Sequence, residues 1–296
     1  MSLLETLRFV TGHPLNRDNK LRALARFFRW QLSSRLAMGD TVFEWVDGAR
    51  FVVRNGETGL TGNVYTGLHE FADMGYLLHV VREDDLFVDV GANVGSYSLL
   101  ACAARGARGH AFEPIPSTFQ RLVQNVRLNH LESRVQCHNL GLGEAESTLL
   151  FTGNMDTVNH VVAAGEGQQS TLQVPVKRLD DLVSLDAPTL MKIDVEGFET
   201  SVLAGGMRTL ADPKLHSVIM ELNGSGARYG FDDAKILSQM DGLGFKAFTY
   251  DPMTRTLTSL QGKNAHTGNT LFIRDLSWAS ARLHSARKLA VHGKLL

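Results

Sequence analysis

The chain has 296 residues, enough for one large domain or for one domain with extensions. Hydrophobic residues make up 44% and charged residues 21%, a composition that is typical of a globular protein and excludes intrinsic disorder. The formal net charge of −1 argues against a general attraction to nucleic acid, so we expect no nucleic-acid partner. The two cysteines, Cys102 and Cys137, cannot form a disulfide framework and are expected to be core thiols in a reducing compartment.

No run of apolar residues reaches about 18, the length of a membrane-spanning helix. The first residues do not combine a compact apolar stretch with a small-residue cleavage site, as a secretory signal would. We therefore predict a cytoplasmic protein. The sequence makes no prediction of oligomeric state.

Residues 1–37 differ from the rest because seven basic residues oppose two acidic ones, a net charge of +5. An apolar stripe within them recurs at spacings of three and four, which predicts an amphipathic helix. The stripe consists of Leu21, Leu24, Phe28, Leu32 and Leu36. We expect this helix to pack on the core or to cover the active site; weak contact with a membrane surface is the alternative.

Short β-like segments follow at 41–46 and 49–54, joined by a hairpin signal at 46–48, with a glycine-rich turn at 56–62. Residues 64–81 are predicted to be helical. These patterns suggest three parts: an N-terminal helical and β extension over 1–63, a main domain over 64–276 and a helical tail over 277–296.

From residue 86 onward, predicted strands and helices alternate, which indicates an α/β fold with a doubly wound, mostly parallel, seven-stranded sheet. The strands are expected near 86–90, 109–113, 134–139, 189–194, 216–222, 245–250 and 269–274, and the helices near 95–104, 116–129, 198–210 and 232–242. The last two strands are expected to form a hairpin-like antiparallel edge. Segments 147–152 and 171–179 are predicted to be an inserted antiparallel pair, and the loop between them, 153–170, is long enough to be a functional flap.

The most informative segment is FVDVGANVGS, residues 87–96. It predicts a strand ending at Asp89, a tight turn framed by Gly91 and Gly95, and the start of a helix at Ser96. The dinucleotide fingerprint would require glycine at position 93, where the chain has Asn93. The turn instead resembles the first motif of S-adenosylmethionine-dependent methyltransferases.

In such a site Asp89 would help to hold the ammonium group of the methionine moiety, and backbone N–H groups at Gly95 and Ser96 would bind its carboxylate. Asn93 is expected to hydrogen-bond within the same loop or to be an ordinary turn residue. Gly91 would allow the ligand to approach the backbone closely.

The second predicted strand ends in HAFEP, residues 110–114, so that Glu113 lies 22 residues after Gly91. An acidic residue at about this distance commonly accepts hydrogen bonds from ribose hydroxyls. Pro114 then ends the strand ladder and is a further candidate cofactor contact. After the third strand, Leu140 and Gly141 are expected to border the adenine.

The segment MKIDVEGFE, residues 191–199, places Lys192, Asp194 and Glu196 on one face of a predicted central strand. Burying three ionisable groups without a purpose would be costly, so Asp194 and Glu196 are candidate catalytic residues. The alternative is that Lys192 is a structural ion-pair partner and that Glu196 and Glu199 favour the start of a helix. Glu221 and Asn223 are expected to reach the same cleft.

Taken together, the segments resemble the FkbM family of methyltransferases. The motifs that carry the resemblance cover about two-thirds of the chain; they are VYTGLHE at 64–70, DVGANVGSYS at 89–98, FEP at 112–114, RLDDL at 178–182, KIDVEGFE at 192–199, ELN at 221–223 and NTLFIR at 269–274. The resemblance implies a Rossmann-like class I methyltransferase fold, S-adenosyl-L-methionine as the methyl donor and a hydroxyl of a sugar, glycan or natural product as the acceptor. It also implies cofactor contacts at Asp89, Gly91, Asn93, Gly95 and Glu113, and matches Asp194 and Glu196 to the family's acidic motif.

A hydroxyl becomes a good nucleophile only when a base accepts its proton. Asp194 is the first candidate for this base, and Glu196, Glu70 and His160 are weaker candidates. The alternative for His160 is a solvated loop residue. Mg²⁺ held by Asp194, Glu221 and Asn223 is possible, but no metal is predicted. Two other classes stay open: a nicotinamide-dependent oxidoreductase, and a non-catalytic cofactor-binding or membrane-peripheral module.

Overall fold

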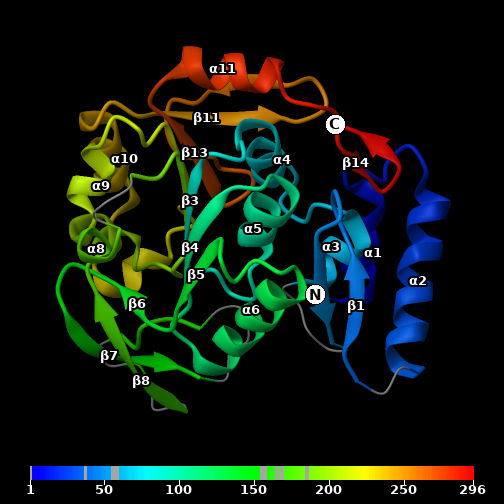
Figure 1. Ribbon diagram of the computed structural model, residues 1–296, viewed down its shortest axis with the longest axis horizontal. Helices are drawn as coiled ribbons and strands as arrows, with labels where there is room; N and C mark the ends of the chain where they lie inside the picture. Colours follow the sequence, from blue (N-terminus) through cyan, green and yellow to red (C-terminus); the bar gives the residue numbers. More distant parts are fainter. Residues whose placement is uncertain are drawn as a thin grey trace.

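The computed structural model describes residues 2–36, 39–54, 60–153, 159–163, 166, 170–183 and 187–296. A central twisted sheet forms the middle layer, and helices cover both of its faces (Figure 1). The strand order is β12-β11-β13-β10-β9-β3-β4-β5. These strands are β3 (Leu86–Val90), β4 (Arg108–Phe112), β5 (Val135–His138), β9 (Leu190–Ile193), β10 (Ser217–Glu221), β11 (Lys246–Asp251), β12 (Thr256–Ser259) and β13 (Asn269–Ile273).

Five neighbouring strands, from β10 to β5, run parallel, and β13 is antiparallel to both β10 and β11. The chain winds outward from β3 in both directions, first to β4 and β5 and later to β9 and β10. The strand order therefore reverses between β3 and β9, and ligands of open α/β sheets bind at the carboxyl ends of the strands at such a point.

The helices that connect the strands pack on opposite faces of the sheet. One side carries α4 (Phe71–Val80), α5 (Ser96–Leu99) with the π-helical turn η1 (Leu100–Ala104), and α6 (Pro116–Leu128). The other side carries α8 (Glu199–Gly205), α9 (Met207–Ala211) and α10 (Asp233–Gly242). All five residues of β3 are buried, Phe87 in one core and Val88 in the other, which explains its nearly continuous apolar sequence.

The sequence predicts the seven main strands, the antiparallel pairing of β11 with β13, and the doubly wound, mostly parallel arrangement, and the structure confirms them. It does not predict the eighth strand, β12, which pairs with β11 through a tight turn and forms the edge of the sheet. The sheet does end in antiparallel strands as expected, but β12 forms the edge and β13 lies inside the sheet, between β10 and β11.

Two predicted helices are shorter than expected. The helix expected over 64–81 is divided into α3 (Thr61–Thr66) and α4, because Gly67 adopts a left-handed φ of 88° and ends the first of them. In the C-terminal tail, α11 (Leu276–His284) is followed by a small hairpin of β14 (Ala290–Val291) and β15 (Lys294–Leu295) rather than by more helix.

The inserted antiparallel pair is confirmed as β7 (Ser147–Thr152) and β8 (Thr171–Lys177), and β6 (Gly141–Leu142) pairs with β8 in parallel. A short helix, α7 (Leu179–Leu182), leads back to the main sheet. Part of the predicted flap lies outside the described residues, namely 154–158, 164, 165 and 167–169. The part that is described folds back on the insert, since Thr152 N–H donates to the carbonyl of His160 at 3.0 Å.

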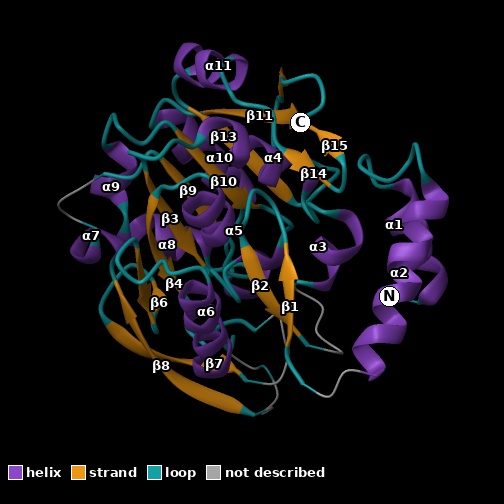
Figure 2. Cartoon of the chain, turned by 45° about the vertical axis from the view of Figure 1, so that its right-hand side comes forward, coloured by secondary structure: helices purple, strands orange, loops and turns teal. Residues whose placement is uncertain are grey.

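The N-terminal extension packs beside the main domain together with the C-terminal hairpin (Figure 2). It comprises α1 (Leu3–Gly12), α2 (Lys20–Leu36) and the hairpin of β1 (Thr41–Glu44) and β2 (Arg50–Val53). The hairpin signal at 46–48 is confirmed, with left-handed φ angles of 52° at Asp47 and 83° at Gly48. Of the predicted glycine-rich turn at 56–62, residues 56–59 lie outside the described part. No helix in the described ranges is long and apolar enough to span a bilayer.

The helix α2 packs on the core as expected, but it does so through a different side from the one that the apolar stripe indicated. Ala23, Phe27 and Trp30 form the buried face of this helix. Leu21, Phe28 and Leu32 point to solvent instead, with 82%, 54% and 64% of their surface exposed. The side chain of Leu36 lies outside the described residues.

Candidate active site

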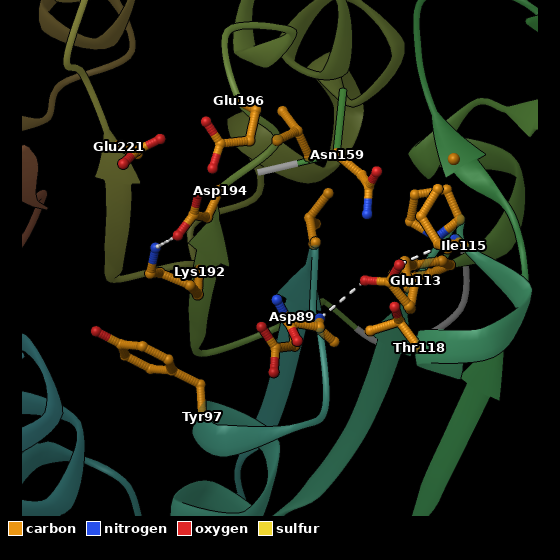
Figure 3. A pocket seen from close by; sticks show the side chains of 18 of the residues that line it. Asp89, Tyr97, Glu113, Ile115, Thr118, Asn159, Lys192, Asp194, Glu196 and Glu221 are labelled. Atoms are coloured by element: carbon orange, nitrogen blue, oxygen red, sulfur yellow. Dashed lines mark hydrogen bonds and ion pairs between the residues drawn. The ribbon is translucent and has the colours of Figure 1, made fainter. Parts of the chain in front are cut away.

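A cleft of about 330 Å³ opens at the carboxyl ends of β3, β4, β9 and β10, where the strand order reverses. Figure 3 shows Asp194, Glu196 and Glu221 at one end and Glu113, Ile115 and Thr118 at the other, with Asp89 between them. The volume lies within the range of small-molecule sites. Most of the predicted site residues line this cleft: Asp89, Gly91, Asn93, Ser96, Glu113, Pro114, Leu140, Gly141, Asp194 and Glu196.

The glycine turn after β3 forms the floor of the cleft. Gly91 has a φ of 77°, and a Cβ at this position would lie 1.8 Å from the backbone oxygen of Asp194. No side chain fits between these two loops. Gly95 does not line the cleft; it has a φ of 94°, and its missing Cβ leaves room for Leu122 of α6. The role of Gly95 in the structure is thus to let α6 pack closely against the turn.

Asp89 lies at the end of β3 and is almost fully buried. Its Oδ2 accepts hydrogen bonds from the backbone N–H and the hydroxyl of Ser98, at 3.0 and 2.6 Å. Burial raises the pKa of Asp89 to about 6, although the Ser98 bonds oppose this shift. The carboxyl group therefore fixes the first turn of α5 against β3 while facing the cleft.

Glu113 follows β4 and ties two loops together. Its Oε2 accepts the N–H of Asn93 and its Oε1 accepts the N–H of Ile115, both at 2.9 Å. Burial raises the pKa of Glu113 to about 7, while these backbone donors favour the charged form. Asn93 has a φ of 51°, a conformation that asparagine tolerates better than most residues. Each carboxylate oxygen can accept a second hydrogen bond, so Glu113 retains capacity for a hydroxyl-bearing ligand.

Apolar side chains surround Glu113 and make this end of the cleft suitable for a flat, weakly polar group. They come from β4, the loops after β4 and β5, the insert and the start of α8: Phe112, Pro114, Ile115, Leu140, Leu142, Phe151, Val161 and Phe198. Gly141 lies among them, where a Cβ would come within 3.3 Å of Phe151 and Val176.

The other end of the cleft, which contains Asp194, Glu196 and Glu221, is called the acidic end. Lys192 is the cation at its centre, and 1% of its surface is exposed. Its Nζ donates to Oδ2 of Asp194 at 2.8 Å and to Oδ1 of Asn269 at 3.3 Å, and it lies over the ring of Tyr97. Burial by itself would lower the pKa of Lys192, but the negative charges of Asp194 and Glu70 outweigh it, so the pKa is raised. Lys192 was expected to form an ion pair, and its partner is Asp194, whose side chain is partly exposed.

Asp194, Glu196 and Glu221 converge so that one carboxylate oxygen of each lies within 4.8 Å of the others. Burial, and then the charge of Asp194, raise the pKa of Glu221 to about 9 and also raise that of Glu196. Glu196 adopts a left-handed φ of 55°, which is rare for a glutamate and typical of constrained functional loops. Oxygen ligands in this arrangement are of the type that Mg²⁺ binds.

Asn223 does not join this group, contrary to expectation. Its side chain is exposed, and its Oδ1 accepts the N–H of Ser225 at 2.8 Å, which starts the 3-10 turn η3 (Ser225–Tyr229). Asparagine frequently stabilises a turn in this way.

The weaker candidates for a base differ in position. Glu70 lines the cleft and accepts hydrogen bonds from the hydroxyl of Tyr97 and the amide of Asn269, both at 2.7 Å. His160 is buried rather than solvated, and its Nε2 lies 2.9 Å from Oε1 of Glu166. Its neighbours Asn159 and Val161 line the cleft, whereas His160 does not.

Three further residues shape the acidic end and were not predicted as site residues. Asn269 joins Lys192, Glu70 and Asp73 from the start of β13. The hydroxyl of Tyr97, a residue of α5, donates a hydrogen bond to Glu70. The amide of Asn269 donates another to Asp73. In the sequence, Asn269 stands out only as a polar residue at the start of the apolar segment NTLFI. This pattern does not indicate which distant residues Asn269 contacts.

The strand order, with one antiparallel strand inserted beside β10 and a glycine turn after β3, defines a Rossmann-like class I methyltransferase fold. The model of the Methyltransferase FkbM domain matches residues 89–247, more than half of the chain. This chain therefore belongs to the FkbM methyltransferase family.

Several known proteins are similar to this chain. Methyltransferase 1 of Beauveria bassiana is 33% identical over 159 residues, which cover 46% of this chain and 64% of that protein. Hexuronic acid methyltransferase AglP of Haloferax volcanii is 32% identical, with 50% and 59% covered. The 31-O-demethyl-FK506 methyltransferase FkbM of Streptomyces tacrolimicus is 29% identical, with 59% and 78% covered. The chain thus spans about three-fifths of the length of the first two relatives.

Among solved structures, Methyltransferase FkbM from Methylobacillus flagellatus is similar at 20% sequence identity and a TM-score of 0.43. The similarity covers 65% of this chain and 44% of that chain.

Proposed function

We propose that this protein is an S-adenosyl-L-methionine-dependent methyltransferase that methylates a hydroxyl oxygen of a sugar, glycan or related natural product. The main support is Glu113, a buried carboxylate that follows β4, lines the cleft and is hydrogen-bonded directly to the glycine turn through the N–H of Asn93. A carboxylate in this position can bind the two hydroxyls of a ribose, and the apolar side chains around it suit an adenine. Family membership and the names of two relatives, one for a hexuronic acid and one for a 31-O-demethyl compound, favour O-methylation.

In this proposal Asp89 and Ser96 would hold the methionine end of S-adenosyl-L-methionine, and Asp194 lines the same cleft. The sulfonium supplies an activated methyl group. Asp194 takes the proton of the acceptor hydroxyl as the new oxygen–carbon bond forms and the carbon–sulfur bond breaks, and the bonding electrons remain on sulfur. Lys192 binds Oδ2 of Asp194 and fixes the carboxylate. Within the described residues, no hydrogen bond is made to Oδ1, which is left for the acceptor.

Glu221 is a poor candidate for the base because, with a pKa of about 9, it already holds a proton at neutral pH. Glu196 is the second catalytic residue in this proposal. It lies beside Asp194 on the loop after β9 and would orient the acceptor hydroxyl by hydrogen bonding.

Calorimetry tests the choice of cofactor. At pH 8, above the pKa of about 7, Glu113 is ionised and the wild-type protein should bind S-adenosylhomocysteine but not NADH. Glu113→Gln should weaken this binding about 10- to 100-fold, the usual effect of losing hydrogen bonds to a charged group. Glu132→Gln, on an exposed loop residue away from the cleft, is the control and should bind normally. Binding of NADH in place of S-adenosylhomocysteine would instead indicate an oxidoreductase.

Metal removal tests whether the three converging carboxylates bind a cation during the reaction. We propose that they do not, because Lys192 already supplies a positive charge to Asp194. Turnover should therefore be unchanged after treatment with EDTA. Loss of turnover that added Mg²⁺ restores would contradict this and would assign the metal to Asp194, Glu196 and Glu221.

A further inference from the structure

The outer side of α2 carries an unusual apolar surface. At 3.6 residues per turn, residues 21, 25, 28 and 32 share one side of the helix, and residues 23, 27, 30 and 34 share the opposite side. The second group is buried against the protein. The first group, which we call the outer ridge, consists of Leu21, Ala25, Phe28 and Leu32 and is exposed along its whole length. Large exposed apolar side chains that line up in this way mark interaction surfaces.

Packing fixes the direction of the outer ridge. Arg26 donates from Nε and Nη2 to the carbonyl of Tyr65 at 3.1 and 2.6 Å, and Gln31 donates to the Tyr65 hydroxyl at 2.7 Å. The ring of Phe27 lies 4.9 Å from that of Tyr65. These contacts attach the inner side of α2 to α3, so the helix cannot turn its outer ridge toward the core without breaking them. Figure 1 shows α2 at the right-hand margin of the molecule, with no other element outside it.

Exposed cations border the outer ridge on both sides. On the helix, Lys20 and Arg35 lie along one flank and Arg22 and Arg29 along the other, and all four side chains are exposed. In the described part of the chain, none of the four has a carboxylate within ion-pair distance. Asp18, an acidic residue near the start of this helix, is paired with Lys294 at 2.7 Å.

We propose that the outer ridge of α2 docks the protein on an anionic phospholipid surface. Leucine and phenylalanine side chains would enter the boundary between headgroups and acyl chains, and the flanking Lys and Arg side chains would reach the lipid phosphates. Charge complementarity favours this occupant over a neutral protein surface, because the cations frame the apolar side chains on both flanks. The proposal concerns attachment and does not depend on the methyl-transfer activity.

Co-sedimentation of the full-length protein with vesicles tests the proposal. Vesicles containing phosphatidylglycerol should bind the wild-type protein at least about tenfold more strongly than vesicles of phosphatidylcholine alone, as expected for several cations at an anionic surface. Added salt should weaken binding. The double variant Leu21→Gln and Leu32→Gln, and separately Arg29→Glu, should each lower binding severalfold. Leu276→Gln, at a residue with 47% exposure on α11, is the matched control and should bind as the wild type.

Circular dichroism should show that the variants fold, since every substituted side chain is exposed. No difference between anionic and neutral vesicles, or equal binding by the Leu21 and Leu32 double variant, would overturn the proposal. So would gel filtration showing a dimer that the same double variant dissociates, because the outer ridge would then be a contact between two copies of the chain.

Discussion

Replacing Asp194 with alanine should lower kcat by about 100- to 10,000-fold, the usual contribution of a general base, while binding of S-adenosylhomocysteine is retained. The expected loss is large because Asp194 is the cleft carboxylate held by Lys192, whereas Glu221 is protonated at neutral pH. Asp194→Asn is a useful second variant, since it keeps the volume and can still accept the hydrogen bond from Lys192. Single-turnover rates and calorimetry on the same samples separate the chemical step from binding.

Glu132→Gln serves as the control here too, because it removes an exposed carboxylate charge far from the cleft. If Asp194→Asn keeps wild-type turnover, another group accepts the proton, and Glu196 becomes the first candidate. If both Asp194 variants lose cofactor binding instead, the role of Asp194 is to position the cofactor.

Gly91→Ala should destabilise the protein and abolish cofactor binding. The left-handed φ of 77° costs a non-glycine residue about 1–3 kcal/mol. In addition, the new Cβ would lie 1.8 Å from the backbone oxygen of Asp194, so β3 and β9 would have to separate at the floor of the cleft. Thermal unfolding followed by circular dichroism measures the first effect, and calorimetry with S-adenosylhomocysteine measures the second.

Gly48→Ala is the matched control, because Gly48 has a similar φ of 83° but no atom within 4 Å of the place that a Cβ would occupy. It should show the backbone strain alone and should leave cofactor binding unchanged. Equal destabilisation by the two variants, with normal cofactor binding in Gly91→Ala, would show that close approach of the two loops is not needed.

The central sheet was predictable because its strands are buried and their apolar sequences are bounded by polar or glycine residues. Asp89 and Glu113 end two such strands, so their approach at one edge of the sheet follows from parallel pairing. β12 was not predicted because edge strands need little apolar sequence, and Thr256–Ser259 is mostly exposed. The insertion of β13 between β10 and β11 depends on pairing between distant segments, which local patterns do not encode.

At the acidic end of the site, too, some residues could be predicted from the sequence and others could not. The motif containing Lys192, Asp194 and Glu196 indicated a charged cluster, and Lys192 does bind Asp194. Asn269, which joins the cluster from 77 positions along the chain, gave no comparable signal. On α2, both sides of the helix contain apolar residues, so periodicity could not tell which side is buried. The side with Phe27 and Trp30 packs inward, and the side with Leu21, Phe28 and Leu32 does not.

A crystal structure of the protein with S-adenosylhomocysteine tests the proposed function most directly. We expect Glu113 to accept hydrogen bonds from both ribose hydroxyls, the adenine to lie among Ile115, Leu140 and Phe151, and the sulfur to face Asp194. An empty cleft at saturating ligand, or a ligand bound elsewhere on the protein, would contradict it.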